Sequence, residues 1–288
     1  NNSKNTIVIG AHYDHLGYGD KGSLYLEKDE KIHNGADDNA SGVSLMLDLA
    51  AKLSLGNNIN NNYLFIAFSG EELGLLGSNY FVKNSTIDKN TINYMINMDM
   101  VGRLNNENSL AVYGLGTSTI FKQTIKSNNT SFKIIENESG VGPSDHTSFY
   151  INDIPVLHFF TGQHSDYHKP SDDSESINYS GIDLISDYII SIITDLNDNG
   201  KLSFRKTKNE NQETPRFKVS LGVIPDYLFD GEGMRIDGVS SGRPAEKTGL
   251  KKGDIVSKLG NHDVKDMMSY MKALSKFNNG DSVNVEIK

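Results

Sequence analysis

Short apolar runs alternate with amphipathic segments over the first two thirds of the chain. The runs NTIVIG (5–10) and YLFIAF (63–68) are typical of buried strands, and the apolar spacing over 41–54 predicts a helix. We expect the buried face of that helix to carry Val43, Leu47, Ala50 and Leu53 or Ser54. Further strands are expected at 93–98, 109–113 and 154–160, and a closing helix at 180–196. This order of elements predicts an α/β fold.

A change of pattern near residue 200 predicts a second domain. Residues 197–215 are polar, charged and poor in large apolar side chains, which is typical of a linker. After them we expect a helix near 265–277, turns that contain glycine, and four short strands. The strands are expected at 217–223, 233–239, 254–259 and 282–287. We therefore divide the chain into a domain over 1–196, a linker over 197–215 and a β-rich domain over 216–288.

Composition narrows the chemistry that the chain can carry. It has 288 residues and no cysteine, which excludes disulfides and thiolate metal ligands. The formal net charge is −9 and no basic cluster is visible, which argues against nucleic acid as a partner. No segment approaches the about 20 apolar residues that a membrane span needs, so none is expected.

Histidine and acidic side chains occur at or beyond the carboxyl ends of the predicted strands. Two imidazoles and three carboxylates suit a pair of divalent metal ions, which typically lie about 3.5–4 Å apart and promote hydrolysis together. Open α/β sheets bind their ligands at this edge, so we expect these side chains to meet in one pocket. The five candidate ligands are His12, Asp38, Glu72, Asp99 and His168.

Most of these residues, taken singly, also have a structural explanation. A histidine after a strand is often a hydrogen-bonded structural residue, which applies to His12 and His168. Asp38 and its neighbour Asp37 are equally typical of helix N-caps. Glu71-Glu72 is also typical of the solvated first turn of a helix. A structural role and a metal-binding role both stay open for these positions.

Two further acids favour the metal-binding interpretation. Asp14 lies two residues after His12, on the same face of an extended segment, where a carboxylate can accept the second imidazole proton of a metal-bound histidine. Asp99 lies inside the apolar run YMINMDMV, where a carboxylate is costly to bury without a partner. A metal ion is a suitable partner for it.

Six motifs, taken in order, resemble peptidase family M28, a family of zinc peptidases. They are HxD (12–14), GADDNASG (35–42), GEELGLLGS (70–78), NMDMVGR (97–103), GPSDHTSF (142–149) and DYHKPSDD (166–173). The resemblance covers roughly residues 6–195 and implies a mixed β-sheet between helices, as in zinc aminopeptidases. It also implies two Zn²⁺ ions per chain, with Asp38 bridging them. One ion would be held by His12, Asp38 and Asp99, and the other by Asp38, Glu72 and His168.

The resemblance implies roles for several neighbours of these ligands. Glu71 inherits the role of general base, because zinc lowers the pKa of bound water to about 7 and a free carboxylate beside it can move the proton. Tyr167 matches a tyrosine that donates a hydrogen bond to the oxyanion, although a packing role is equally compatible with its position. Asp145 and His146 match an element near the pocket and are expected to form hydrogen bonds without binding metal.

We expect a metallo-aminopeptidase that hydrolyses peptides or proteins with a free N-terminus, using a zinc-bound hydroxide as nucleophile. A glutaminyl-cyclase-like transferase is the main alternative, but the pockets of those enzymes are rich in tryptophan and this chain has none. A non-catalytic scaffold stabilised by metal is the third interpretation, and the intact Glu71 argues against it.

The C-terminal region resembles a PDZ domain. FKVSLGV (217–223) resembles the first strand and carboxylate-binding loop, in which the amides of Leu221, Gly222 and Val223 would face a peptide C-terminus. Such a domain binds an extended peptide as an added strand. The alternative is that another part of this chain fills that edge and the domain is structural.

Two expectations concern the ends and location of the chain. Only eleven residues precede His12, so part of the catalytic domain is expected to be missing at the N-terminus. The resemblance to secreted aminopeptidases implies export, to the periplasm, the cell surface or the medium. The opening NNSKNT has no charged region followed by an apolar one, so no signal peptide is visible.

Overall fold

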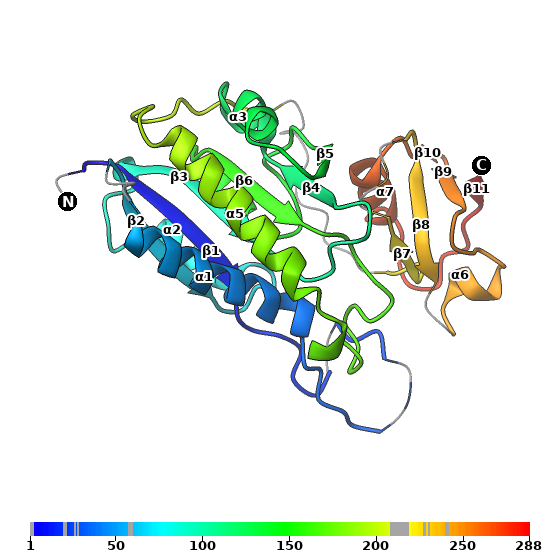
Figure 1. Cartoon of the computed structure of the whole chain (residues 1–288). Helices are drawn as coiled ribbons and strands as arrows, with labels where there is room; N and C mark the ends of the chain where they lie inside the picture. Colours follow the sequence, from blue (N-terminus) through cyan, green and yellow to red (C-terminus); the bar gives the residue numbers. More distant parts are fainter. Residues whose placement is uncertain are drawn as a thin grey trace.

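The computed structural model describes residues 3–19, 22–25, 27, 29–56, 60–207, 219–226, 229, 231–239 and 242–288. The first part of the chain forms a mixed six-stranded sheet with helices on both faces, and a smaller β-rich unit follows it (Figure 1). The expected fold class, an α/β sheet sandwiched by helices plus a small β-rich domain, is therefore confirmed. Within the described ranges no helix is long and apolar enough to cross a membrane.

The large sheet has the strand order β2-β1-β3-β6-β4-β5. The first four strands in that order are parallel to one another, while β4 pairs antiparallel with β6 and parallel with β5. The strands are β1 (Thr6–His12), β2 (Asn62–Phe68), β3 (Ile92–Met98), β4 (Ser109–Tyr113), β5 (Lys133–Glu136) and β6 (Val156–Phe160). The carboxyl ends of β1, β2, β3 and β6 therefore meet at one edge, as the candidate ligands require.

Alternate residues of the central strands enter two different cores, because side chains of a strand point to opposite faces of the sheet. Ile7 and Ile9 pack in one core with Leu49 and Ile189, which come from the helices α1 (Gly42–Leu55) and α5 (Tyr179–Leu196). Val8 lies in the opposite core, beneath α2 (Leu76–Lys83) and α4 (His146–Tyr150). Burial on both faces explains why these strands are continuous apolar runs.

The predicted strands and the two long helices of this domain are present, but the predicted buried face of α1 is mostly wrong. Leu53 is buried as expected, whereas Leu47 is 63% exposed. Leu45, Met46 and Leu49 form the rest of the buried stripe. The segment VSLMLDLAAKL contains two overlapping apolar stripes at helical spacing. Only the direction from which the sheet approaches the helix decides which stripe is buried. The sequence analysis also missed α2, α3 (Phe121–Ser127), α4 and β5.

Part of the expected linker lies against the first domain. Phe204 forms a β-bridge with Ser118, Leu202 is buried, and the main-chain amide of Thr207 donates to the hydroxyl of Tyr150. The rest of the expected linker, from 208 to 215, is outside the described residues.

The C-terminal unit is built on antiparallel strands. β7 (Val223–Pro225), β8 (Met234–Val239), β9 (Ile255–Leu259) and β10 (His262–Asp263) follow one another in the sheet, and β11 (Val285–Ile287) also pairs with β9. Two helices complete it, α6 (Pro244–Lys247) and α7 (Met267–Leu274), and Asp266 caps α7 through the amide of Ser269. The strand expected at 217–223 begins only at Val223, and residues 217–218 are outside the described part.

Candidate metal centre and active-site pocket

The first group of candidate ligands surrounds His12 at the end of β1. Its Nε2 lies 3.3 Å from Oδ1 of Asp38 and 3.4 Å from Oδ1 of Asp99. This nitrogen is buried and has no well-aligned hydrogen bond. A tetrahedral zinc ion with ligands at 2.0–2.1 Å keeps its ligand atoms about 3.3–3.4 Å apart. The three atoms therefore fit a shell around one ion better than they fit hydrogen bonds to one another.

The second group surrounds His168, in the loop after β6. Its Nε2 lies 3.2 Å from Oδ2 of Asp38 and 3.1 Å from Oε2 of Glu72. The other ring nitrogen lies 2.8 Å from the carbonyl of Gly22, to which it donates, so Nε2 keeps its lone pair. Asp38 thus faces His12 with one oxygen and His168 with the other. The structure brings all five predicted ligands together, in two groups that share this carboxylate.

The carboxylate of Asp14 lies in a different position from the one expected. It was expected to accept the second proton of His12, but that ring N–H points to the main-chain oxygen of Asp14, 3.1 Å away. The carboxylate instead accepts the main-chain amides of Glu71 and Glu72, at 3.1 and 3.3 Å. Its Oδ1 lies 3.8 Å from Nδ1 of His12, which is too far for a hydrogen bond. Asp14 therefore orients the Glu71-Glu72 turn, because the chain bends after β1 and turns this side chain towards the end of β2.

The two adjacent glutamates have opposite electrostatic environments. Burial raises the pKa of Glu71 well above its usual value, and the nearby carboxylates of Asp99, Asp145 and Glu72 add to this against the opposing effect of His12. Burial also opposes the ionisation of Glu72, but the neighbouring imidazoles of His15 and His168 outweigh it and lower the pKa of Glu72 to about 2. Glu72 is therefore ionised, as a metal ligand must be, whereas Glu71 binds a proton more readily.

A buried network supports the segment that carries Asp38. The carboxylate of Asp172 accepts the amides of Asp37 and Asp38 at 2.9 and 3.1 Å, and Arg103 donates to its other oxygen at 3.3 Å. Asp37 accepts the amide of Gly102 at 2.6 Å and lies 3.1 Å from a nitrogen of His164. Asp37 is therefore not the cap of α1. The sequence analysis missed Asp172 in this role, although it lies in the quoted motif DYHKPSDD.

Asp145 and His146 lie in the interior beside the two groups. The His146 ring stacks on that of His158, with 4.3 Å between the centroids, and burial lowers the pKa of His146 well below its usual value. Burial raises the pKa of Asp145 to about 7. Neither residue belongs to the two ligand groups. The hydrogen bonds expected from them are not found, because both carboxylate oxygens of Asp145 and both ring nitrogens of His146 are buried without a well-aligned hydrogen-bond partner in the described part of the chain. The prediction of a hydrogen-bonding role is therefore wrong for these two side chains, which pack in the interior instead.

A sequence model described as peptidase family M28 matches residues 1–193, about two thirds of the chain. The chain belongs to peptidase family M28. A PDZ domain model matches residues 201–288, so a PDZ domain follows the M28 domain.

Curated relatives carry aminopeptidase names. The chain is 34% identical over 166 residues to a probable leucine aminopeptidase of Trichophyton verrucosum, a match that covers 53% of this chain and 41% of that protein. It is 28% identical over 200 residues to aminopeptidase YwaD of Bacillus subtilis, covering 65% of this chain and 40% of the relative. The chain thus spans about two fifths of the length of these curated relatives.

Solved structures share the fold of the M28 domain. A zinc aminopeptidase from Bacillus subtilis has a TM-score of 0.56 at 25% identity, with 72% of this chain and 48% of that chain covered. The glutaminyl cyclase of Porphyromonas gingivalis has a TM-score of 0.57 at 18% identity, with 67% and 74% covered. The second likeness shows a shared fold only.

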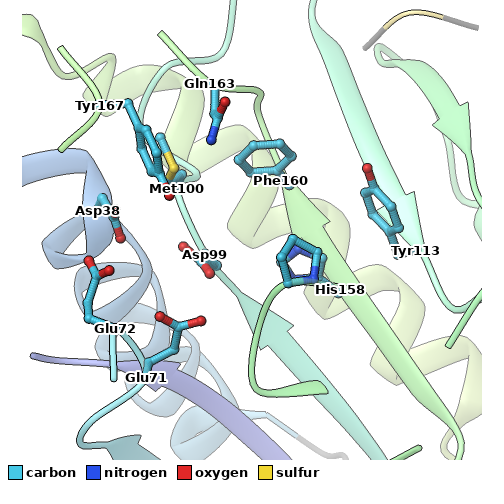
Figure 2. Close-up of a pocket in the computed structure, with 11 residues that line it drawn as sticks. Asp38, Glu71, Glu72, Asp99, Met100, Tyr113, His158, Phe160, Gln163 and Tyr167 are labelled. Atoms are coloured by element: carbon cyan, nitrogen blue, oxygen red, sulfur yellow. The ribbon is translucent and has the colours of Figure 1, made fainter. Parts of the chain in front are cut away.

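The M28 domain has a pocket at the candidate metal centre, whose lining is shown in Figure 2. The carboxylates gather at one end, and aromatic side chains lie further along the pocket. Tyr167 stacks on His168 with 3.8 Å between the ring centroids, and it packs against the buried pair Met100 and Phe160. Tyr167 is therefore a packing residue that also lines the pocket. The other lining residues are Asp38, Glu71, Glu72, Asp99, Tyr113, Pro143, His158 and Gln163.

The PDZ domain has a pocket of its own beside the expected carboxylate-binding loop. Leu221 lines it together with Leu274 at the end of α7 and Phe277 just beyond. Gly222 has φ +83°, and a Cβ there would approach the side chain of Arg243 to 2.1 Å, so the loop needs a glycine at this position. Val223 begins β7, whose partner is β8.

Proposed function

We propose that this chain carries the catalytic domain of a metallo-aminopeptidase that binds two zinc ions and releases N-terminal residues from peptides. The observation that carries the proposal is the sharing of Asp38. His12 and His168 each place Nε2 at 3.2–3.3 Å from a different oxygen of this one carboxylate. Such an arrangement suits two neighbouring ions.

The five ligand side chains fit zinc in kind as well as in spacing. Imidazole nitrogens and carboxylate oxygens are common zinc ligands, and a site with three protein donors per ion leaves a position free for water or substrate. When bound, the ions polarise the substrate carbonyl and lower the pKa of a coordinated water to about 7. One ion would be held by His12, Asp38 and Asp99, and the other by Asp38, Glu72 and His168.

The remaining chemistry falls to side chains of this chain. Glu71 lines the pocket without belonging to either ligand group, and its raised pKa suits a group that accepts a proton during the reaction. In the proposal it accepts the proton of the attacking water and passes it to the departing amine nitrogen. Tyr167 lines the same pocket, from which its hydroxyl would donate to the oxyanion. Acidic groups at the end of the pocket would attract the free α-amine of the substrate.

The variant Glu71→Gln tests this proposal, because it removes the proton acceptor while leaving the ligand groups in place. We expect two equivalents of zinc by elemental mass analysis, and release of residues from unblocked peptides reduced by a factor on the order of 10²–10⁴. The control is Glu175→Gln, a change at an exposed glutamate that is not among the residues lining the pocket. A wild-type rate for Glu71→Gln at full zinc loading would exclude Glu71 from the mechanism.

Three further measurements separate the alternatives. Cyclisation of N-terminal glutamine by a protein with one zinc would favour the cyclase interpretation, which the shared fold with glutaminyl cyclase alone does not decide. Zinc binding without any turnover would favour a metal-stabilised scaffold. Equal cleavage of acetylated and free peptides would indicate an endopeptidase.

For the PDZ domain we propose binding of an extended peptide C-terminus along β7. The place of β7 at the end of the strand order β10-β9-β8-β7 and the apolar pocket lined by Leu221, Leu274 and Phe277 support this. Fluorescence titration with C-terminal peptides, against the same peptides amidated at the C-terminus, tests it. Equal affinity for both forms would rule out recognition of the carboxylate.

A further inference from the structure

His15, three residues beyond the candidate ligand His12, makes a contact that the proposed metal assignment does not include. Its Nδ1 lies 2.9 Å from Oε1 of Glu72. The two side chains are only 9% and 8% exposed, so little water competes for this contact. The second oxygen of Glu72, Oε2, faces Nε2 of His168 at 3.1 Å. The two oxygens of one carboxylate thus have different partners.

The length of the His15 contact indicates a direct hydrogen bond. N–H···O bonds have a preferred length of about 2.9–3.0 Å, whereas two ligands of a tetrahedral zinc ion lie about 3.3–3.4 Å apart. The 2.9 Å from His15 to Glu72 matches the first value, and the distances at His12, 3.3 and 3.4 Å, match the second. The distances at His168, 3.1 and 3.2 Å, lie between the two values. His15, Asp38 and Glu72 also offer ligand atoms within 4.8 Å of one another, so the length of the His15 contact is the observation that favours a hydrogen bond over a shared ion. His15 therefore donates to Glu72, and Oε2 is the oxygen that remains for an ion.

The surroundings of His15 are shaped to hold this ring. A Cβ at Gly35, whose φ is +62°, would come within 2.7 Å of the ring carbon Cγ, so only glycine leaves room for it. The ring of His168 meets it edge-on with 5.8 Å between the centroids, and that of His33 lies 6.5 Å away at a tilt. Both ring nitrogens of His33 have other partners, the hydroxyl of Ser23 and the carbonyl of Lys31.

We propose that His15 is a positioning residue that holds Glu72 as a one-oxygen zinc ligand and thereby leaves proton transfer to Glu71. This inference rests on the proposed function. Without the N–H at Oε1, Glu72 can rotate, bind through both oxygens or swing towards the pocket. A carboxylate that is hydrogen-bonded at its second oxygen keeps the orientation that the ion needs. The imidazole of His15 thus gives the two adjacent glutamates different roles, with Glu72 binding the ion and Glu71 transferring the proton.

The test compares three substitutions at this position in the full chain. Asn places its amide nitrogen near the position of Nδ1, Gln places it near Nε2, and Ala has no donor. We expect His15→Ala and His15→Gln to bind one zinc as the wild type does and the other about 10–100-fold more weakly, and His15→Asn to recover most of that affinity. Competition with a chromophoric chelator measures the two affinities, and thermal unfolding of each variant reports the fold.

The matched control is His33→Ala, which removes the neighbouring ring and leaves the Glu72 contact intact. It is expected to keep both zinc affinities. Wild-type affinity at both sites in His15→Ala overturns the proposal. If His15→Asn is as weak as His15→Ala, the ring itself binds the ion and the positioning role is wrong. If the wild-type chain binds no zinc, the proposed function fails instead, so the two failures are distinguishable.

Discussion

The carboxylate of Asp172 accepts the main-chain amide of Asp38 at 3.1 Å, across 134 positions of sequence. Asp172 is fully buried, and the same oxygen also accepts the amide of the preceding residue. A main-chain contact of this kind sets the orientation of the shared carboxylate without touching it. The rigidity of the candidate metal centre therefore depends on a residue outside the ligand set.

Replacing Asp172 by Ala is expected to destabilise the protein by about 3 kcal/mol, because two amides lose their acceptor and Arg103 loses a buried partner. Urea unfolding monitored by circular dichroism measures this. The control is Asp166→Ala, which removes the other partner of Arg103, a carboxylate that is 27% exposed. This control change should lower the free energy of unfolding by less than about 1 kcal/mol. Equal losses in the two variants would contradict a special role for Asp172.

Asp14→Ala is expected to slow turnover more than it lowers zinc content. The change removes the acceptor for the amides of Glu71 and Glu72, and misplaced glutamates cost rate even when an ion still binds. We expect kcat to fall by a factor on the order of 10–100, the usual range for outer-shell substitutions. Steady-state kinetics and elemental analysis on one preparation give both quantities. The prediction is wrong if zinc loss accounts for the whole loss of rate.

His158 is expected to make the apoprotein less stable in acid. Burial lowers its pKa to about 4, with Asp99 opposing and His12 adding to the shift. The unfolded chain therefore takes up a proton below a pH of about 6.5, and the folded chain does so only near pH 4. Above pH 6.5 the ring is neutral in both the folded and the unfolded chain. As the pH falls towards 4, only the unfolded chain takes up the proton, and the free energy of unfolding decreases by about 3 kcal/mol in total.

Urea unfolding of chelator-treated protein between pH 7 and 4.5 checks this dependence. His158→Gln should show a shallower fall in the free energy of unfolding than the wild type. His262→Gln, a change at an exposed histidine of β10, should follow the wild type. Parallel curves for wild type and His158→Gln would show that this ring takes up its proton at the same pH in the folded and unfolded chains, which contradicts the prediction.

Removal of zinc is expected to lower the melting temperature. Two groups of buried carboxylates and imidazoles come together in the fold, and an ion that binds only the folded state at 1,000 times its Kd adds about 4 kcal/mol. For a domain of 150–250 residues this corresponds to about 8–16 °C, at about 2–4 °C for each kcal/mol. Scanning calorimetry with and without a chelator measures it. An unchanged melting temperature would exclude tight zinc binding by the folded chain.

The strands and the ligands were accessible from sequence because both depend on local patterns. The buried parallel strands are apolar runs, and an acid or histidine at the end of such a run is conspicuous. The short elements α2, α4 and β5 were missed because fewer than nine residues carry too little periodicity to distinguish. The wrong face of α1 has another cause: Leu45 and Leu47 lie on two competing stripes, and helical spacing alone favours neither.

The partners of the site residues depended on the three-dimensional path of the chain. Asp14 was expected beside the His12 ring because an extended segment places residues i and i+2 on the same face. The segment turns instead, so the carboxylate of Asp14 accepts the main-chain amides of Glu71 and Glu72. His15 directly follows the HxD motif, but nothing in its spacing indicates that its ring reaches Glu72, 57 positions away.

The sequence by itself determined the family, the order of the elements and the five side chains suited to metal, because apolar periodicity and ligand chemistry are properties of the residues. Only the tertiary structure decided which oxygen faces which nitrogen, that Asp38 is shared, and that Glu71 and Glu72 differ in proton affinity. The physical reason is that hydrogen bonds and desolvation depend on distances of a few ångströms between segments far apart in the chain. Such distances are set by packing of the whole domain.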